Sequence, residues 1–153
     1  AKETFMHIPY LYHYANRPDK SSKIVRRILS KAYKPERFGI PDNEDMGCHS
    51  AFYICGLLGI YPMMGQDWYF LVAPAFERSV IRLGQSGAEL IIEAQNPSDK
   101  NVYIESASLD RARLDRAWIR HEEIKHGAVL SFSLSSSETD WGRHNPPPSP
   151  LSS

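Results

Sequence analysis

The residues best suited to chemistry in this sequence form an acidic turn in front of an apolar segment. Asp42, Asn43, Glu44 and Asp45 directly follow Pro41. The three carboxylates repel one another at this spacing and stay ionised only if water, hydrogen-bond donors or a cation lies nearby. The turn could therefore hold a cation or supply a general base. It could equally cap the following helix, with Asp42 or Asn43 as N-cap, because the positive end of the helix dipole favours acidic side chains.

A second group of polar and aromatic side chains lies in residues 1–16. Here a carboxylate, two histidines and three alternating tyrosines occur close together, namely Glu3, His7, His13, Tyr10, Tyr12 and Tyr14. Aromatic faces pack on the C–H surfaces of sugars, while hydroxyls and imidazoles supply directed hydrogen bonds. The segment could thus form a sugar-binding wall, or an aromatic helix buried in a core. Pro9 favours a helix, because proline is common in the first helical turn.

The elements that must position these groups are predicted to be helical as far as residue 62. After a turn at 17–20, with Ser21 or Ser22 as N-cap, residues 23–33 place their apolar side chains on one helical face. Residues 45–58 are apolar on nearly every side. We expect this second helix to be buried all round, with its small residues allowing close approach of a neighbouring helix.

Beyond residue 62 the pattern changes to short β-rich runs separated by glycine and Asn-Pro. These runs cover residues 69–72, 79–83, 89–94, 101–107 and 129–134. They predict an antiparallel sheet or small sandwich. The proline- and serine-rich residues 143–153 predict a disordered tail. The expected fold class is therefore α+β, with a helical part at 1–62, an antiparallel β part at 63–142 and the tail at 143–153.

Composition excludes several classes of function. The 153 residues carry a net charge of zero and no cluster of basic residues, which argues against a nucleic-acid partner. No apolar run approaches the roughly 20 residues that cross a bilayer, so no membrane association is expected. The start at Ala1 shows no signal-peptide pattern. Cys48 and Cys55 lie about 10 Å apart along one predicted helix, beyond the reach of a disulfide, and should be free packing residues.

The two groups of residues resemble two motifs of one known family. The acidic turn, followed by Gly47, residues 50–53 (SAFY) and residues 58–62 (LGIYP), resembles a motif of the calcium-dependent exo-α-mannosidases of glycoside hydrolase family 92. That motif reads G-N-D/E-D-x-G-x-x-S-A-W-Y and ends L-G-F-Y-P. Upstream, Glu3 and residues 7–15 (HIPYLYHYA) resemble the family motif N-E-P-x-x-H-I-P-Y-L-Y-x-Y-A. The likeness covers roughly residues 3 to 142.

The resemblance implies a fold, a reaction and a set of site residues. The helices would be the C-terminal helices of an (α/α)6 toroid, and the reaction would be calcium-dependent, inverting hydrolysis of terminal α-linked mannose. By matching position, Asp45 would be the general base, and Asn43 would orient the water or the base. Glu3 would lie at the Ca²⁺ and substrate site, with His7 also binding substrate. Met6 departs from the motif, since it stands where the family usually has another histidine.

The resemblance also implies partners and a location. The substrate would be a mannose-containing glycan, as in N-glycan processing, and the parent enzyme would be secreted or periplasmic. The family's general acid lies upstream of both motifs, and no residue here matches it. The chain would then be a fragment that needs the missing N-terminal part of the same enzyme and is inactive alone. Two alternatives stay open: a non-catalytic glycan-binding or interaction module, and a piece that completes the barrel of another chain.

Overall fold

The computed structural model describes residues 3–149, with side chains from Thr4 onward. The helices come first in the chain, and their bounds are η1 Glu3–Phe5, η2 Ile8–His13, α1 Pro18–Ala32, η3 Asp45–Gly47 and α2 Cys48–Leu58. The strands follow as β1 Ile60–Pro62, β2 Trp68–Leu71, β3 Arg78–Leu83, β4 Ala88–Gln95, β5 Tyr103–Leu109, β6 Ala112–Leu114, β7 Trp118–Arg120 and β8 Ala128–Ser135, with the short helix η4 His121–Glu123 before β8. The expected α+β class is confirmed.

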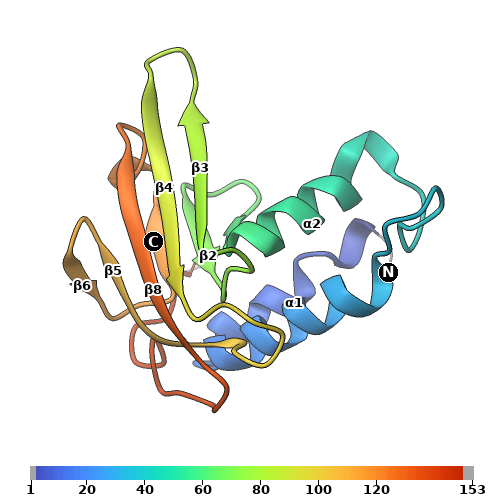
Figure 1. Ribbon diagram of the computed structural model, residues 1–153. Coiled ribbons are helices and arrows are strands. Elements are labelled where there is room, and N and C mark those ends of the chain that lie inside the picture. The colour runs from blue at the N-terminus through green and yellow to red at the C-terminus, as the bar shows by residue number, and fades with distance from the viewer. Residues whose placement is uncertain (1–2, 150–153) are drawn as a thin grey trace.

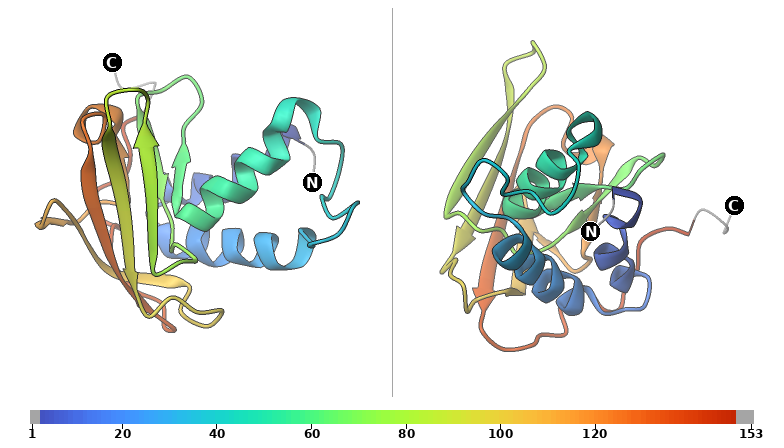
Figure 2. Two further views of the ribbon diagram at one scale, coloured as in Figure 1. Left: turned by 45° about the horizontal axis from the view of Figure 1, so that its top comes forward. Right: turned by 90° about the vertical axis from the view of Figure 1, so that its right-hand side faces the viewer.

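The elements form three layers. One sheet has the order β1-β2-β7 and the other β3-β4-β8-β5-β6. Figures 1 and 2 show α1 and α2 on one side of the β part, with the five-stranded sheet on the far side. The small β1-β2-β7 sheet lies between them and contributes to both hydrophobic cores. Leu71 packs with the five-stranded sheet, whereas Phe70 and Val72 pack with the helices. Alternation along β2 thus joins the layers.

The sheet topology corrects the expectation of a purely antiparallel sheet. β4 and β8 pair in parallel, in the register Ile92 to Leu130, while the other neighbours pair antiparallel. A parallel pair needs a crossover, and the chain makes it through β5, β6, β7 and η4. Three-residue strands β1, β6 and β7 were not expected, because three residues are too few to establish an alternating pattern.

The start of α1 also differs from the expectation of a serine cap. The helix begins at Pro18, and the residues expected to cap it, Ser21 and Ser22, are buried within it. The Ser22 hydroxyl accepts a hydrogen bond from the backbone N–H of Ala73 at 3.1 Å. Proline suits the first helical position because its missing N–H would be unpaired there anyway. The serines instead connect the helix to the β part.

The helix expected at residues 45–58 is divided into η3 and α2. Met46 and Gly47 adopt positive φ angles of 57° and 83°, so the regular helix starts only at Cys48. α2 is not buried all round either, since Tyr53 and Ile54 are 37% and 55% exposed. Its opposite side does pack closely, because a Cβ on Gly56 would lie 3.0 Å from Leu29 of α1. The close helix approach is therefore confirmed, and full burial is not.

The beginning of the expected disordered tail packs on the fold. The Trp118 indole donates a hydrogen bond to the backbone oxygen of Asn145 at 3.1 Å. Arg143 forms ion pairs with Asp19 at 3.4 Å and Asp140 at 2.8 Å. Composition alone did not reveal these contacts, because they depend on acceptors and carboxylates from distant elements. Within residues 3–149, no helix combines the length and apolar character needed to span a membrane.

Candidate functional site

A pocket of about 530 Å³ lies where the N-terminal segment meets the start of α2. Its lining is mostly apolar and rich in sulfur, and consists of Thr4, Met6, His7, Asp45, Met46, Cys48, Ala51, Phe52, Cys55, Tyr61, Pro62 and Met64. Two residues expected to act at a site, His7 and Asp45, thus line one pocket although they are far apart in sequence. We call this cavity the helical pocket.

The N-terminal wall of the helical pocket depends on the turn into η2. His7 is the N-cap residue of η2, which has proline in its first turn. One turn later, Tyr10 is fully buried and stacks on Tyr61, with ring centroids 4.0 Å apart and planes 12° apart. Phe52 meets both rings edge-on, at 6.1 and 6.0 Å. The tyrosine-rich segment is therefore a 3-10 helix whose buried ring supports an aromatic pocket wall.

The acidic turn divides into residues with different roles. Asp45 is exposed at the mouth of the helical pocket, whereas Asn43 is exposed without lining it. Neither Asp42 nor Asn43 is the N-cap of α2, since Gly47 occupies that position and no side chain caps from it. Instead, a Glu44 carboxylate oxygen accepts a hydrogen bond from the backbone N–H of Ser50 at 3.1 Å. Glu44 thus takes over capping because the positive φ angles before Cys48 displace the helix start.

Glu3 is placed only in part. Its backbone begins η1, and the next residue, Thr4, lines the helical pocket. Its side chain lies outside the described residues, so its relation to Asp45 stays a prediction. Among the described residues, no group of three or more His, Cys, Asp or Glu side chains is arranged to hold a metal ion.

Burial raises the pKa of one hydroxyl and of one thiol that line the helical pocket. It raises the pKa of Tyr61, with a further contribution from Cys55 and Cys48. It also raises the pKa of the Cys55 thiol. Both cysteines are free, as their spacing predicted. Among the described lining residues, Asp45 is then the one carboxylate, and His7 is the one imidazole. A hydroxyl-bearing ligand would find an apolar wall and these two polar groups at the mouth.

A buried histidine, which does not itself line the helical pocket, connects η2 to its neighbouring elements. His13 lies at the end of η2, with Nε2 3.0 Å from the carbonyl oxygen of Leu71 in β2. Its Nδ1 lies 3.0 Å from the Ser21 hydroxyl and 2.9 Å from the carbonyl oxygen of Tyr10. With the proton on Nε2, the ring donates to Leu71 and accepts from Ser21. His13 was expected to be a possible wall residue, but it instead fixes η2 to α1 and β2.

Sequence reasoning did not identify the sulfur-rich side of the helical pocket. Met64 follows β1, while Cys48 and Cys55 lie seven residues, or about two turns, apart on α2. The spacing of the two cysteines placed them on one helical face, which was the available signal. No sequence pattern indicated that Met64 would line the pocket, because its position depends on the turn between β1 and β2. Chemically, the site offers one base, one imidazole and an apolar wall that could contact the C–H face of a sugar.

Comparisons with known proteins agree on one family. A sequence profile for the glycosyl hydrolase family 92 catalytic domain matches residues 1–136. An uncharacterized secreted glycosidase of Arthroderma benhamiae is 33% identical over 144 residues, which are 92% of this chain and 19% of that protein.

Solved structures give the same result. A family 92 α-mannosidase of Bacteroides thetaiotaomicron in complex with mannoimidazole matches with a TM-score of 0.89 and 27% identity, over 95% of this chain and 20% of that one. A family 92 inverting mannosidase of the same organism matches with a TM-score of 0.84 and 28% identity, over 93% and 19%. The chain thus spans about a fifth of the length of these relatives.

Proposed function

Because this chain belongs to glycosyl hydrolase family 92, we propose that it forms part of a glycosidase that removes terminal α-linked mannose with inversion. The single observation that carries the proposal is the helical pocket, which is lined by His7 and Asp45 together with the rings of Phe52 and Tyr61. An apolar ring wall suits one face of a pyranose, and the two polar groups suit its hydroxyls and an attacking water.

In this proposal Asp45 is the general base. Its exposed carboxylate accepts a proton from the water that attacks the anomeric carbon. Inverting glycosidases need a second carboxyl group about 6.5–9.5 Å away, which protonates the leaving oxygen. Asp45 is the one carboxylate among the described lining residues, and the proposal places this acid in the preceding part of the enzyme. His7 holds a sugar hydroxyl. Asn43 would orient the water or the base, and it has to turn inward from its exposed position to do so.

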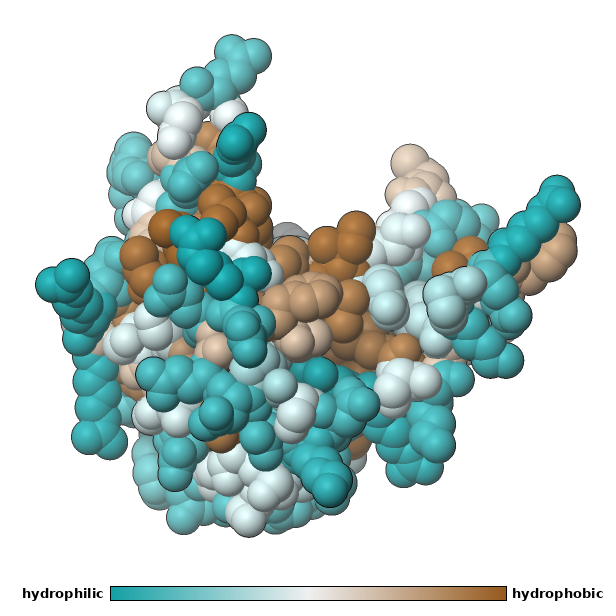
Figure 3. All heavy atoms as spheres, in the orientation of Figure 1, coloured by the Kyte–Doolittle hydropathy of each residue, from teal (hydrophilic) through white to brown (hydrophobic). Residues whose placement is uncertain are grey.

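The exposed side of α2 supports a larger assembly. Ile54 is 55% exposed on α2, and Figure 3 shows apolar side chains gathering in the hollow between the β3–β4 hairpin and α2. Leaving such surface in water forgoes about 25 cal/mol for each Å² that could be buried. We therefore propose that further helices of an (α/α)6 toroid cover this side, supplied by the preceding part of the same enzyme. The same surface would suit a piece that completes the barrel of another chain.

Calcium also belongs to the proposal, as an ion held jointly with polypeptide outside the chain. Glu3 would supply one carboxylate, and the remaining oxygens would come from elsewhere, because the described residues hold no cluster for a metal. Bound Ca²⁺ would orient sugar hydroxyls and stabilise charge. We further propose that the enzyme is secreted, as the Arthroderma relative is named, and that it acts on mannose-containing glycans.

The proposal is tested with the polypeptide encoded by the full reading frame that contains this chain. Mannose release from α-1,2-mannobiose is followed by proton NMR, which also identifies the first anomer formed. We expect β-mannose first, dependence on Ca²⁺, and a loss in kcat of about 10² to 10⁴ for Asp45→Asn, the range for one acid–base group. Asp42→Asn, in the same turn but outside the helical pocket, is the matched control. Full activity of Asp45→Asn or α-mannose as first product would refute the proposal.

The second candidate is a glycan-binding module without catalysis. It is favoured by a polar groove on the five-stranded sheet, far from the helical pocket in the fold, and that groove leads to a separate inference.

A further inference from the structure

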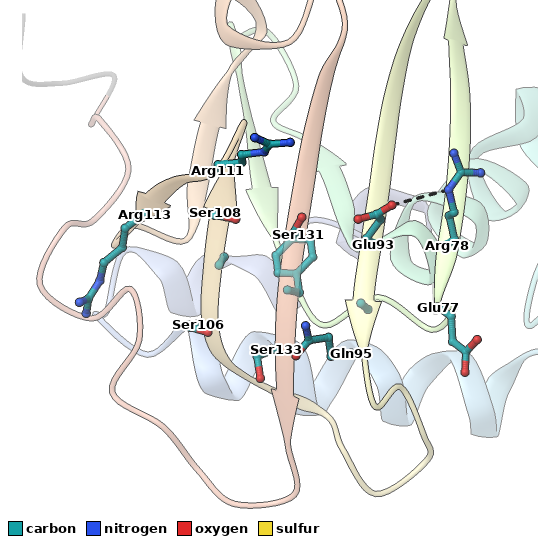
Figure 4. A pocket seen from close by; sticks show the side chains of 13 residues that line it. Glu77, Arg78, Glu93, Gln95, Ser106, Ser108, Arg111, Arg113, Ser131 and Ser133 are labelled. Atoms are coloured by element: carbon teal, nitrogen blue, oxygen red, sulfur yellow. Dashed lines mark ion pairs between the residues drawn. The ribbon is translucent and has the colours of Figure 1, made fainter.

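The outer face of the five-stranded sheet is hollowed into a groove with a volume of about 720 Å³. Its floor is formed by four serines on the two neighbouring strands β5 and β8, namely Ser106, Ser108, Ser131 and Ser133. Their small side chains leave the hollow that Figure 4 shows from close by. We call this cavity the polar groove.

Strand register places the groove residues in rows across the sheet. One row crosses all five strands and consists of Arg78, Glu93, Ser131, Ser108 and Arg113. Gln95, Ser133 and Ser106 form the neighbouring row. Strands favour β-branched and aromatic residues, so serine contributes little to the stability of the sheet at these positions. A run of small hydroxyl residues between charged rims is a surface arranged for hydrogen bonding.

The two rims carry different charged side chains, with Glu77, Arg78 and Glu93 on one side and Arg111 and Arg113 on the other. On one side, Arg78 and Glu93 form a loose ion pair at 3.7 Å, with both side chains about half exposed. On the other side, Arg111 forms no ion pair with any described residue. In Figure 4 the Arg111 guanidinium points toward β8 at one end of the serine rows, whereas Arg113 points away. A ligand over the serines would therefore meet a donor on one side and a carboxylate on the other.

This arrangement selects for a neutral ligand that both donates and accepts hydrogen bonds. Arg111 can only donate and Glu93 can only accept, whereas serine hydroxyls do both. A ligand with one strong charge is disfavoured, because an anion is repelled by Glu93 and a cation is repelled by Arg111 and Arg78. A chain of sugar hydroxyls has the matching chemistry.

We propose that the polar groove is a secondary binding site for a neutral oligosaccharide, with Arg111, Ser108, Ser131 and Glu93 as its hydrogen-bonding residues. That the sugar is mannose rests on the proposed function. The site would retain a polymannose chain beside the enzyme while the helical pocket acts on its end. Phe132, the one aromatic residue among the described groove residues, is only 2% exposed and offers no platform for a sugar ring. Binding therefore depends on hydrogen bonds, and it should be weak and specific to the pattern of hydroxyls on the sugar.

The test is a heteronuclear NMR titration of the 153-residue chain with α-linked mannotriose. Saturable shifts are expected at amides of β5 and β8 on the groove. Arg111→Gly should weaken binding by about tenfold, the effect of losing one or two charge-assisted hydrogen bonds. Arg111 has a φ angle of 69°, which glycine adopts readily, so this variant removes the guanidinium while the turn and the fold are retained.

Three further samples make each outcome decisive. Arg82→Ala changes an exposed arginine of β3 that does not line the groove, and its affinity should equal that of the unmodified chain. Asp45→Asn should leave the groove shifts intact, so failure of the catalytic proposal stays separate from failure of this one. Unchanged affinity in Arg111→Gly would overturn the inference. The third sample is the unmodified chain with a hexaglutamate peptide, which serves as an anionic control. Groove shifts that appear with this peptide alone, or no groove shifts with mannotriose, would also overturn the inference.

Discussion

The buried His13 should make the chain lose stability as the pH falls below neutrality. Burial lowers the pKa of its imidazole from the ordinary 6.5 to about 4, although hydrogen bonds to the carbonyls of Leu71 and Tyr10 act in the opposite direction. A protonated ring could donate to both carbonyls, yet it would be a charge in a buried position against the ring of Phe70. Burial therefore outweighs the hydrogen bonds.

The direction follows from proton binding. Between pH 6.5 and about 4 the unfolded chain binds a proton at this histidine and the folded chain does not, so stability rises with pH. The contribution is fully present above pH 6.5 and is lost as the pH falls through about 4. The difference between the two pKa values corresponds to about 3 kcal/mol in the free energy of unfolding.

Urea unfolding followed by tryptophan fluorescence at pH 4 to 8 measures this term. His13→Gln keeps a neutral donor and acceptor in the same place, so its loss between pH 7 and 4 should be smaller than that of the unmodified chain by about 3 kcal/mol. His126→Gln changes an exposed histidine and should retain the full loss. An identical pH profile for His13→Gln and the unmodified chain would refute the reasoning.

Other expectations concern the turns, the helix cap and calcium. A Cβ on Gly59, where φ is 80°, would lie 2.6 Å from the carbonyl oxygen of Val72, so Gly59→Ala should lower the free energy of unfolding in urea by more than about 2 kcal/mol. Gly65 has a similar φ but open space around it, so Gly65→Ala should cost only about 1 kcal/mol. Equal losses in the two variants would contradict the clash. Glu44→Ala should cost about 1 kcal/mol and speed amide exchange at Ser50, and unchanged exchange would rule out the cap. Calorimetry of the 153-residue chain should detect no Ca²⁺ binding in the micromolar range, and stoichiometric binding would contradict a shared site.

Local patterns in the sequence predicted the parts of the fold that depend on period and side-chain size. Leu130, Phe132 and Leu134 alternate in sequence, and all three are buried on the inner face of β8. Gly56 predicted the close contact of α2 with α1. The likeness of two separated motifs led to the family, and both motifs contribute residues to the helical pocket, including Asp45.

The features that could not be predicted depend on distant contacts. The parallel pairing of β4 with β8 is fixed by a crossover that no local pattern reveals. Serine is a favoured helix cap, but the Ser22 hydroxyl instead accepts a hydrogen bond from the backbone N–H of Ala73, which follows β2. The positive φ of Met46 runs against the preference of that residue type, and it decides that Glu44 caps α2 while Asp45 faces the pocket.

The most direct test of the central claim is the rate of mannose release by the full-reading-frame polypeptide carrying Asp45→Asn, compared with Asp42→Asn. If the helical pocket is the catalytic site, Asp45→Asn loses about 10² to 10⁴ in kcat with little change in KM, while Asp42→Asn keeps its rate. Equal rates for the two variants would show that the carboxylate beside His7 takes no part in the chemistry.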